Sequence, residues 1–195
     1  IIGGSGYGST ARNCTLKSCY LYDDTQIGGL TSGCIDFTLQ DCVIIGNVKM
    51  LYFGNLPTIT DNKFYGTVAI KDGNNGGQVV DHKTLFPNNE YLSAVPGAAY
   101  LRANAYDATR ANLTIFNGSQ ANTIEVDVSS IYPNGTQVQA INVQDYFNDI
   151  QNLTVAAGKI TVNMQAENRT IAAPQGWTAP ATVFPSFGCF VLVKQ

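Results

Sequence analysis

Three segments near the start of the chain repeat one pattern, and this repeat restricts the possible folds more than any other feature. The segments are TLKSCYLYDD from Thr15, TLQDCVIIGN from Thr38 and TITDNKFYGT from Thr58, with spacings of 23 and 20 residues. Each contains Thr, then Leu or Ile, two mostly polar residues, Cys or Asn, and a run rich in aromatic and β-branched residues. A period of about 22 residues is too short for paired helices and suits one coil of a parallel β-helix.

The alignment places Cys19, Cys42 and Asn62 at the same position of successive coils. Equivalent residues of stacked coils are about 4.8 Å apart, so we predict that these side chains form one row inside the coils. Buried Cys behaves as a small hydrophobic residue, and Asn62 can continue the row by bonding backbone groups of the turn. A disulfide is the alternative, because Cys14 and Cys34 lie just outside the aligned runs; with five Cys, at least one thiol stays unpaired within the chain.

The cysteine spacing does not predict a metal site, and we expect no metal and no cofactor. Zinc sites use closely paired ligands such as C-x₂-C, with further Cys or His nearby. Here the first four cysteines are 5, 15 and 8 residues apart, and Cys189 stands far from them. The single His, His82, has no second His and no nucleophile near it in the sequence, so it is interpreted as a surface residue.

Acidic residues also repeat, since Asp41 and Asp61 share the position that Ser18 occupies in the first segment. A column of carboxylates on a β-helix face can bind Ca²⁺ or catalyse sugar cleavage. Two carboxylates are too few for a calcium shell of about 6–8 oxygens, so the simpler interpretation is a solvated turn edge. No catalytic residue is therefore predicted. Asp41 and Asp61 are the candidates if the chain cleaves glycans, a reaction that needs two facing carboxylates.

Turn signals separate the repeats from the rest of the chain. The stretches DGNNGG, FPNN and VPG interrupt the pattern. We expect β-helix coils over 1–70, a connector over 71–97 with a short strand near 78–80, and a second unit over 98–195.

The second unit alternates apolar and polar residues in the manner of antiparallel strands. In NTIEVDVSSI, for example, Ile124, Val126 and Val128 face one way, and Glu125 and Asp127 face the other. Turn signals about every ten residues predict a β-sandwich. The predicted fold class is all-β: a short right-handed parallel β-helix followed by an antiparallel β-sandwich.

The stretches YLRANAYDATRANLTIFN, IEVDVSSIYPNGTQVQAINVQDYF, GKITVNMQ and FPSFGCFVLVK resemble the C-terminal β-sandwich of extracellular right-handed parallel β-helix proteins. Gly118 stands where that pattern usually has Trp. Related sandwiches close many carbohydrate-processing enzymes, and in them the sandwich is an accessory unit that caps the last coil. The positions that match are Arg102, Asn104, Tyr106, Arg110, Asn117, Asp127, Gln144, Asp145 and Phe147.

The resemblance implies a non-catalytic C-terminal part of an extracellular, carbohydrate-associated β-helix protein, with further β-helix N-terminal to this chain. The alternatives are a structural or adhesive fibre, such as a phage tail spike or surface filament subunit, and a polysaccharide-cleaving enzyme. We expect an extracellular, virion or cell-surface location. The expected partners are a polysaccharide or cell-surface glycan and other copies of the chain.

Composition limits the other partners. Hydrophobic residues make up 45% of the chain, which indicates a folded protein. Only 13% of residues are charged and the net charge is −3, so there is no electrostatic reason to expect nucleic acid. No apolar run approaches the length of about 18 residues that a membrane-spanning helix needs.

Two sets of residues are candidates for contact with glycans or for carrying them. Aromatic side chains offer flat apolar faces to sugar rings, although most aromatic residues serve packing. The candidates for contact are Tyr20, Tyr22, Tyr52, Tyr65 and Trp177. Asn-x-Ser/Thr sequons, which are glycosylated only in a secretory pathway, occur at Asn13, Asn112, Asn117, Asn134, Asn152 and Asn168.

Overall fold

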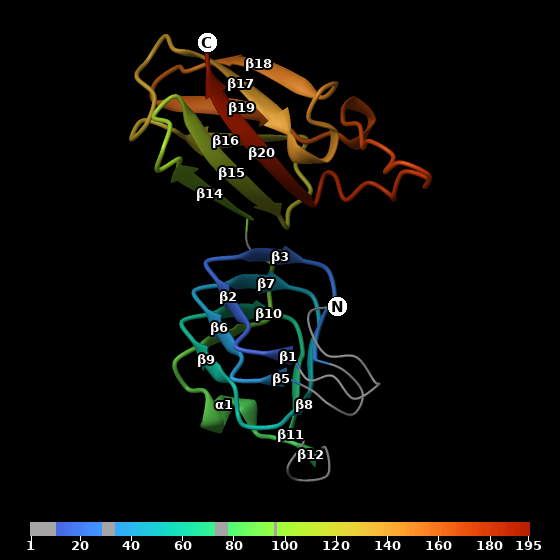
Figure 1. Ribbon diagram of the computed structural model, residues 1–195. Coiled ribbons are helices and arrows are strands. Elements are labelled where there is room, and N and C mark those ends of the chain that lie inside the picture. Colours follow the sequence, from blue (N-terminus) through green and yellow to red (C-terminus); the bar gives the residue numbers. More distant parts are fainter. Residues whose placement is uncertain (1–10, 29–33, 73–77, 96) are drawn as a thin grey trace. The chain divides into compact units, whose positions relative to one another are not determined.

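The computed structural model describes residues 11–28, 34–72, 78–95 and 97–195, and the fold is all-β (Figure 1). The chain divides into two compact units, residues 1–95 and 96–195. The first contains a β-solenoid of about three turns, and the second contains an antiparallel sheet. Both parts of the predicted fold class are confirmed.

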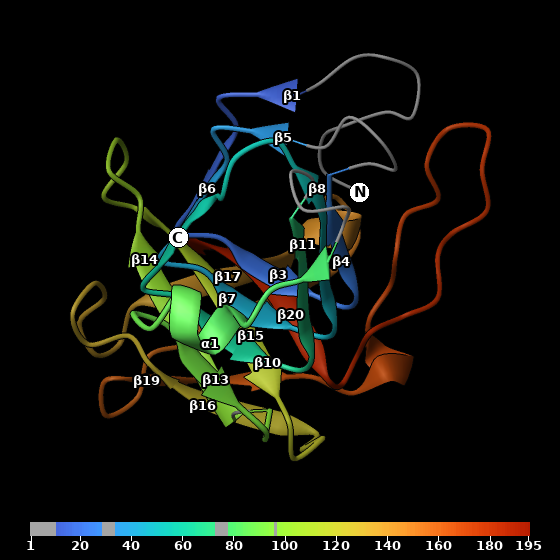
Figure 2. The same ribbon diagram turned by 90° about the horizontal axis from the view of Figure 1, so that it is seen from below.

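Short strands from successive coils stack side by side to form the faces of the solenoid, and all of them pair in parallel except the last strand of one face (Figures 1 and 2). Thr15, Thr38 and Thr58 pair in register, as the repeat predicted. The strands are β1 (Ala11–Arg12) with β5 (Cys34–Ile35); β2 (Thr15–Lys17), β6 (Thr38–Gln40) and β9 (Thr58–Thr60); β3 (Tyr20–Tyr22), β7 (Val43–Ile45), β10 (Lys63–Tyr65) and β13 (Glu90–Leu92); and β4 (Thr25–Ile27), β8 (Val48–Phe53), β11 (Val68–Asp72) and β12 (Gln78–Val79).

The chain turns between faces at residues with positive φ, and this explains why Asp, Asn, Ser and Gly recur there. Asp41 and Asp61 have φ of 53° and 61°, and short polar residues tolerate this left-handed conformation best. Gly46 has φ of 111°, and a Cβ on it would lie 2.6 Å from the carbonyl carbon of Asp23 in the preceding coil. The polar residue types in the repeat therefore set the corners of the coil.

Inward-facing residues of the second and third coils fill the solenoid. Leu39, Ile44 and Phe64 are at most 1% exposed. The equivalent residues of the first coil, among them Leu16 and Leu21, are only partly buried. The first coil is therefore covered less completely than the coils that follow it.

The segment expected as a connector adds to the solenoid. β12 pairs antiparallel with β11, in agreement with the predicted short strand, and α1 (His82–Leu85) follows it. β13 then pairs in parallel with β10, so the ladder continues past residue 70 to Leu92. Phe86, at 8% exposure, belongs to the solenoid core.

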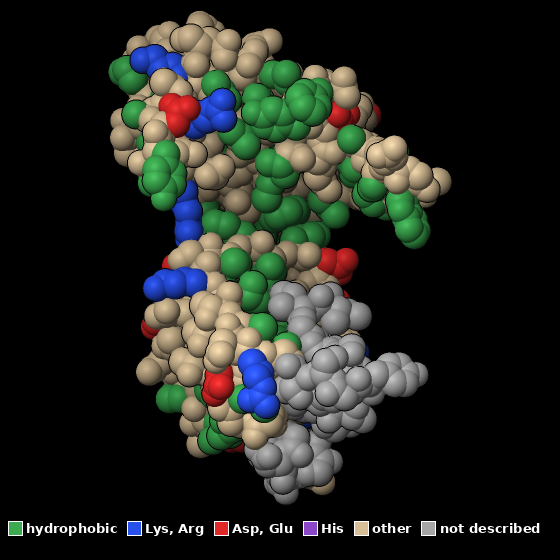
Figure 3. All heavy atoms as spheres, viewed as in Figure 1, with side chains coloured by type: hydrophobic (Ala, Val, Ile, Leu, Met, Phe, Trp, Pro, Cys, Tyr) green, Lys and Arg blue, Asp and Glu red, His purple; other side chains and the backbone are tan. Residues whose placement is uncertain are grey.

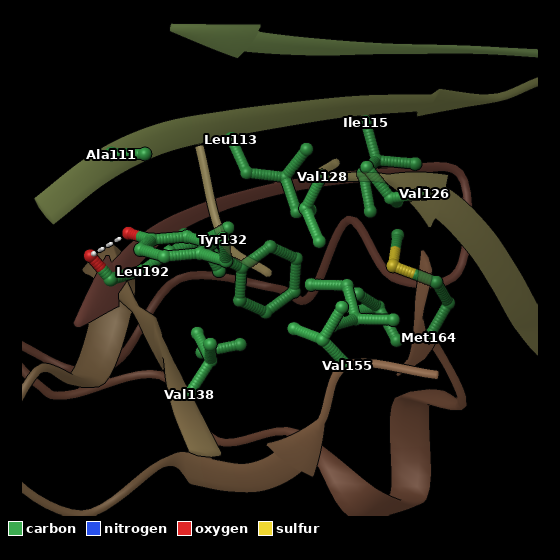
Figure 4. Packing of buried hydrophobic residues seen from close by; sticks show 14 of the residues in the cluster. Ala111, Leu113, Ile115, Val126, Val128, Tyr132, Val138, Val155, Met164 and Leu192 are labelled. Atoms are coloured by element: carbon green, nitrogen blue, oxygen red, sulfur yellow. Dashed lines mark hydrogen bonds between the residues drawn. The ribbon is translucent and has the colours of Figure 1, made fainter. Parts of the chain in front are cut away.

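In the second unit, a five-stranded antiparallel sheet and a two-stranded one enclose a single core (Figure 4). Tyr132 lies in this core with 1% exposure, and its hydroxyl donates to the carbonyl of Thr109 at 3.3 Å. Val126 and Val128 face the same core, as the alternation predicted. The elements are β14 (Gly97–Ala103), β15 (Arg110–Asn117), β16 (Thr123–Asp127), β17 (Gln137–Asn142), η2 (Val143–Asp145), β18 (Ile150–Thr154), β19 (Lys159–Asn163), η3 (Ala166–Asn168) and β20 (Phe187–Lys194).

Candidate functional site

An open groove of about 670 Å³ lies on the first unit, where the last coil and α1 meet the corner that follows β10. Its aromatic walls are Tyr65 of β10 and Tyr91 of β13, which come from neighbouring coils. Neutral polar side chains that line the groove include Asn47 and Thr67, which directly precede β8 and β11. The solenoid thus brings residues that are far apart in the sequence into one hollow.

Tyr91 is fixed in place by contacts on both its ring and its hydroxyl. The ring stacks on Phe64 with centroids 5.4 Å apart and planes at 8°. The hydroxyl donates to the carbonyls of His82 and Phe86, each at 3.2 Å. Burial raises the pKa of Tyr91, so the hydroxyl keeps its proton at neutral pH. The groove therefore has a rigid, neutral aromatic wall.

Two basic side chains border Tyr91. The ring centroid of His82 lies 5.0 Å from that of Tyr91, and Lys83 Nζ lies 5.9 Å from the same centroid. Burial, and then the charge of Lys83, lower the pKa of His82, whereas Asp81 opposes this shift. His82 is therefore neutral at neutral pH.

The carboxylate of Asp81 accepts hydrogen bonds from the backbone N–H and the hydroxyl of Thr84 at the start of α1.

A row of polar side chains joins this groove to a smaller hollow of about 240 Å³. The backbone N–H and the side-chain amide of Asn47 donate to Asp24 Oδ1 at 2.8 and 3.0 Å, and the Thr67 hydroxyl donates to Asn47 Oδ1 at 2.5 Å. Asn47 lines both hollows. Polar groups thus continue from coil to coil along this corner.

The structure brings one of the five aromatic candidates, Tyr65, into the groove. Tyr20 and Tyr22 are partly exposed on β3. Tyr52 lies in β8, and its side chain is outside the described residues. Trp177 is 79% exposed in the loop before β20. Tyr91 was not among the predicted contact residues, because it lies in the segment expected as a connector.

Asp41 and Asp61 lie at equivalent, exposed corners, as predicted, but away from the groove. The carboxylate of Asp41 accepts a hydrogen bond of 2.6 Å from the Ser18 hydroxyl of the preceding coil. Asp61 lines a separate hollow of about 360 Å³ together with Glu90. This geometry is that of a solvated turn edge.

The predicted inner row exists and extends one residue further than expected. The backbone N–H of Cys19 donates to Cys42 Sγ at 3.5 Å, and that of Cys42 donates to Asn62 Oδ1 at 2.9 Å. The N–H of Asn62 in turn donates to Asn89 Oδ1 at 3.0 Å. We call Cys19, Cys42, Asn62 and Asn89 the inner row.

All five cysteines are free thiols. Cys14 and Cys34 are not register partners, because Cys34 pairs with Ala11 and the next residues follow in step. Among the described residues, no three His, Cys, Asp or Glu side chains are grouped so that they could hold a metal ion.

One sequon conflicts with the structure. Asn117 is fully buried, and its side-chain amide donates to the carbonyls of Ala121 and Pro185, each at 2.8 Å. The folded chain therefore does not present Asn117 to a glycosylating enzyme. The exposed sequon residues are Asn13, Asn112, Asn134, Asn152 and Asn168.

Figure 3 shows few basic and acidic side chains on the visible face, and they do not gather into one patch. Within the described ranges, no helix has the length and hydrophobicity needed to cross a bilayer. Searches against protein-family models, characterised proteins and solved structures find no match to this chain.

Proposed function

We propose that this chain is a non-catalytic, glycan-contacting part of an extracellular parallel β-helix protein, with its second unit as an accessory domain. The observation that carries the proposal is the groove with Tyr65 and Tyr91 as aromatic walls. Sugar rings bind through apolar faces laid on aromatic rings and through hydroxyls that bond polar groups. Asn47 and Thr67 supply such groups beside the two rings.

The chemistry of the groove favours binding over cleavage. Glycoside hydrolysis uses two carboxylates on either side of the scissile bond. Among the described residues that line the groove, none is Asp or Glu. His82, which is neutral at neutral pH, borders Tyr91 and Lys83. The groove therefore offers contacts without a pair of acids to cleave what it holds.

Removing the aromatic wall is expected to weaken glycan binding. Tyr65→Ala should reduce affinity by about tenfold, since an aromatic contact contributes about 1.4 kcal/mol. Isothermal titration calorimetry against a panel of neutral and acidic polysaccharides measures the change. Tyr22→Ala is the matched control, because Tyr22 occupies the same strand position two coils away and is not part of the groove.

Equal affinities for the wild type and Tyr65→Ala would contradict this site. The same panel, analysed for products, tests the enzyme alternative. Turnover by the wild type that disappears in an Asp41→Asn, Asp61→Asn variant would show that the exposed corner is catalytic.

The structural-fibre alternative is supported by the first coil. Leu16, Cys19 and Leu21 face inward but are only partly buried, whereas Leu39, Cys42 and Ile44 behind them are at most 1% exposed. Such an edge favours the addition of another coil. If it takes up a second copy, sedimentation velocity should show an assembly that Leu16→Lys dissociates. A wild-type chain that stays monomeric at high concentration would remove the support for a fibre.

A further inference from the structure

Two thiols of the inner row stand one coil apart at the same corner. The pairs Lys17–Gln40 and Tyr20–Val43 flank them in register. The Cys19 thiol donates to the carbonyl of Lys17 at 3.3 Å, and the Cys42 thiol donates to the carbonyl of Gln40 at 3.2 Å. The two side chains therefore have the same orientation, and the N–H of Cys19 donates to Cys42 Sγ.

We propose that Cys19 and Cys42 form a disulfide that joins the first coil to the second when the protein meets a small-molecule disulfide such as oxidised glutathione. This bond would be a covalent modification of the solenoid edge. It does not depend on glycan binding, because neither cysteine lines the groove.

The geometry requires a small movement. Neighbouring coils are about 4.8 Å apart, within the Cα separation of about 4.4–6.8 Å that disulfides use. The Cβ atoms must come to about 3.8 Å, roughly 1 Å closer than the coil spacing. Cys42 is held from behind by Asn62, whereas Cys19 belongs to the partly covered first coil. We therefore expect Cys19 and the first coil to move toward Cys42, and not the reverse.

Exposure sets the order of the steps. Cys19 is partly exposed and Cys42 is 1% exposed, so the oxidant reaches Cys19 first. The Cys19 thiolate attacks oxidised glutathione, forms a mixed disulfide and releases one glutathione thiolate. The Cys42 thiolate then attacks the Cys19 sulfur and releases the second. The two cysteines lose two protons and two electrons, and one oxidised glutathione becomes two reduced molecules.

The other cysteines have no comparable partner. The register places Phe37 opposite Cys14 and Ala11 opposite Cys34. Cys189 lies in the second unit, beside the Thr114 hydroxyl. In the inner row, Asn62 follows Cys42. Among the described residues, Cys19 and Cys42 are therefore the only two thiols that neighbour each other in this row.

The test is incubation of the full chain with oxidised glutathione, followed by alkylation, intact-mass measurement and peptide mapping. We expect a product that takes up three alkyl groups where the reduced chain takes up five, with Cys19 and Cys42 in one cross-linked peptide pair. Burial raises the pKa of Cys42, although the hydrogen bond from the backbone N–H of Cys19 opposes this shift in part. The second step, attack by Cys42, should therefore become about tenfold faster for each unit by which the pH rises, as long as the pH is below that pKa, because the thiolate fraction increases.

Variants separate the two steps. Cys42→Ser and Cys42→Ala should each leave a stable glutathione adduct on Cys19, whereas Cys189→Ser should still form the cross-link. The proposal is overturned if wild-type Cys19 keeps its adduct or resists the oxidant. A cross-link that maps to Cys14 and Cys34 instead would also overturn it.

Discussion

Replacing Asp149 by Ala is expected to lower the free energy of unfolding of the second unit by about 3–5 kcal/mol, because it leaves a buried cation without its partner. Arg169 Nη1 lies 2.6 Å from Asp149 Oδ1, and the two side chains are only 8% and 3% exposed. Asp149 Oδ2 also accepts hydrogen bonds from the Asn142 side chain and from the N–H of Thr170. The carboxylate therefore joins three segments of the unit.

Arg169 depends on this one carboxylate. Its Nε has no hydrogen-bond partner among the described residues, and the contact of Nη1 with Asp149 is not aligned as a hydrogen bond. Loss of Asp149 would leave the guanidinium buried and uncompensated, which costs far more than the pair itself contributes.

Chemical denaturation, combined with peptide-resolved hydrogen exchange to separate the two units, measures the effect. Glu125→Ala is the matched control, because Glu125 pairs with Lys159 at 3.1 Å but both side chains are more than half exposed. An exposed ion pair contributes at most about 1 kcal/mol. Equal losses for the two variants would show that the Asp149–Arg169 pair does not hold the unit together.

Asn62→Leu should destabilise the solenoid by about 3–5 kcal/mol, although the two side chains have similar size. Asn62 is 1% exposed. Its amide donates to the carbonyls of Leu39 and Thr60, each at 2.9 Å, and its Oδ1 accepts from the N–H of Cys42. Each buried group that loses its partner costs about 1–3 kcal/mol, and Leu replaces none of these bonds.

An exposed pair at another corner, Asp36 and Asn55, supplies the control for this prediction. Asn55 Oδ1 accepts from the N–H of Asp36 at 3.0 Å, and Asn55 Nδ2 donates to Asp36 Oδ1 at 2.8 Å. Both residues are exposed, so water replaces these bonds in Asn55→Ala, and we expect a loss of about 1 kcal/mol or less. If the two variants unfold at the same denaturant concentration, burial of the inner row is not what stabilises the coils.

The sequence predicted the solenoid because equivalent residues carry the same chemistry in every coil. The last residue of the inner row, Asn89, was not predicted, because the spacing of its coil differs. Asn88, Asn89 and Glu90 repeat the positions of Asp61, Asn62 and Lys63, but at a spacing of 27 residues instead of 20 or 23. Turn signals around Pro87 concealed that match. The groove was missed with it, because Tyr91 belongs to the same coil.

Alternation of apolar and polar residues does not reveal every strand of the second unit. β18 has the sequence IQNLT, in which Gln151 is 8% exposed. The backbone N–H of Asn163 donates to Gln151 Oε1 at 2.8 Å, so a polar side chain occupies an inward position. Apolar alternation cannot reveal a strand whose inward residue is an amide, because its partner is supplied by β19.

The common register of the coils limits how the length of the solenoid can change during evolution. An insertion of one whole coil keeps each Cys or Asn above another and each positive-φ residue at a corner. An insertion of one residue within a strand would turn the inward side chains that follow it in that strand outward. Related chains should therefore differ in length by whole coils, with smaller changes confined to the turns.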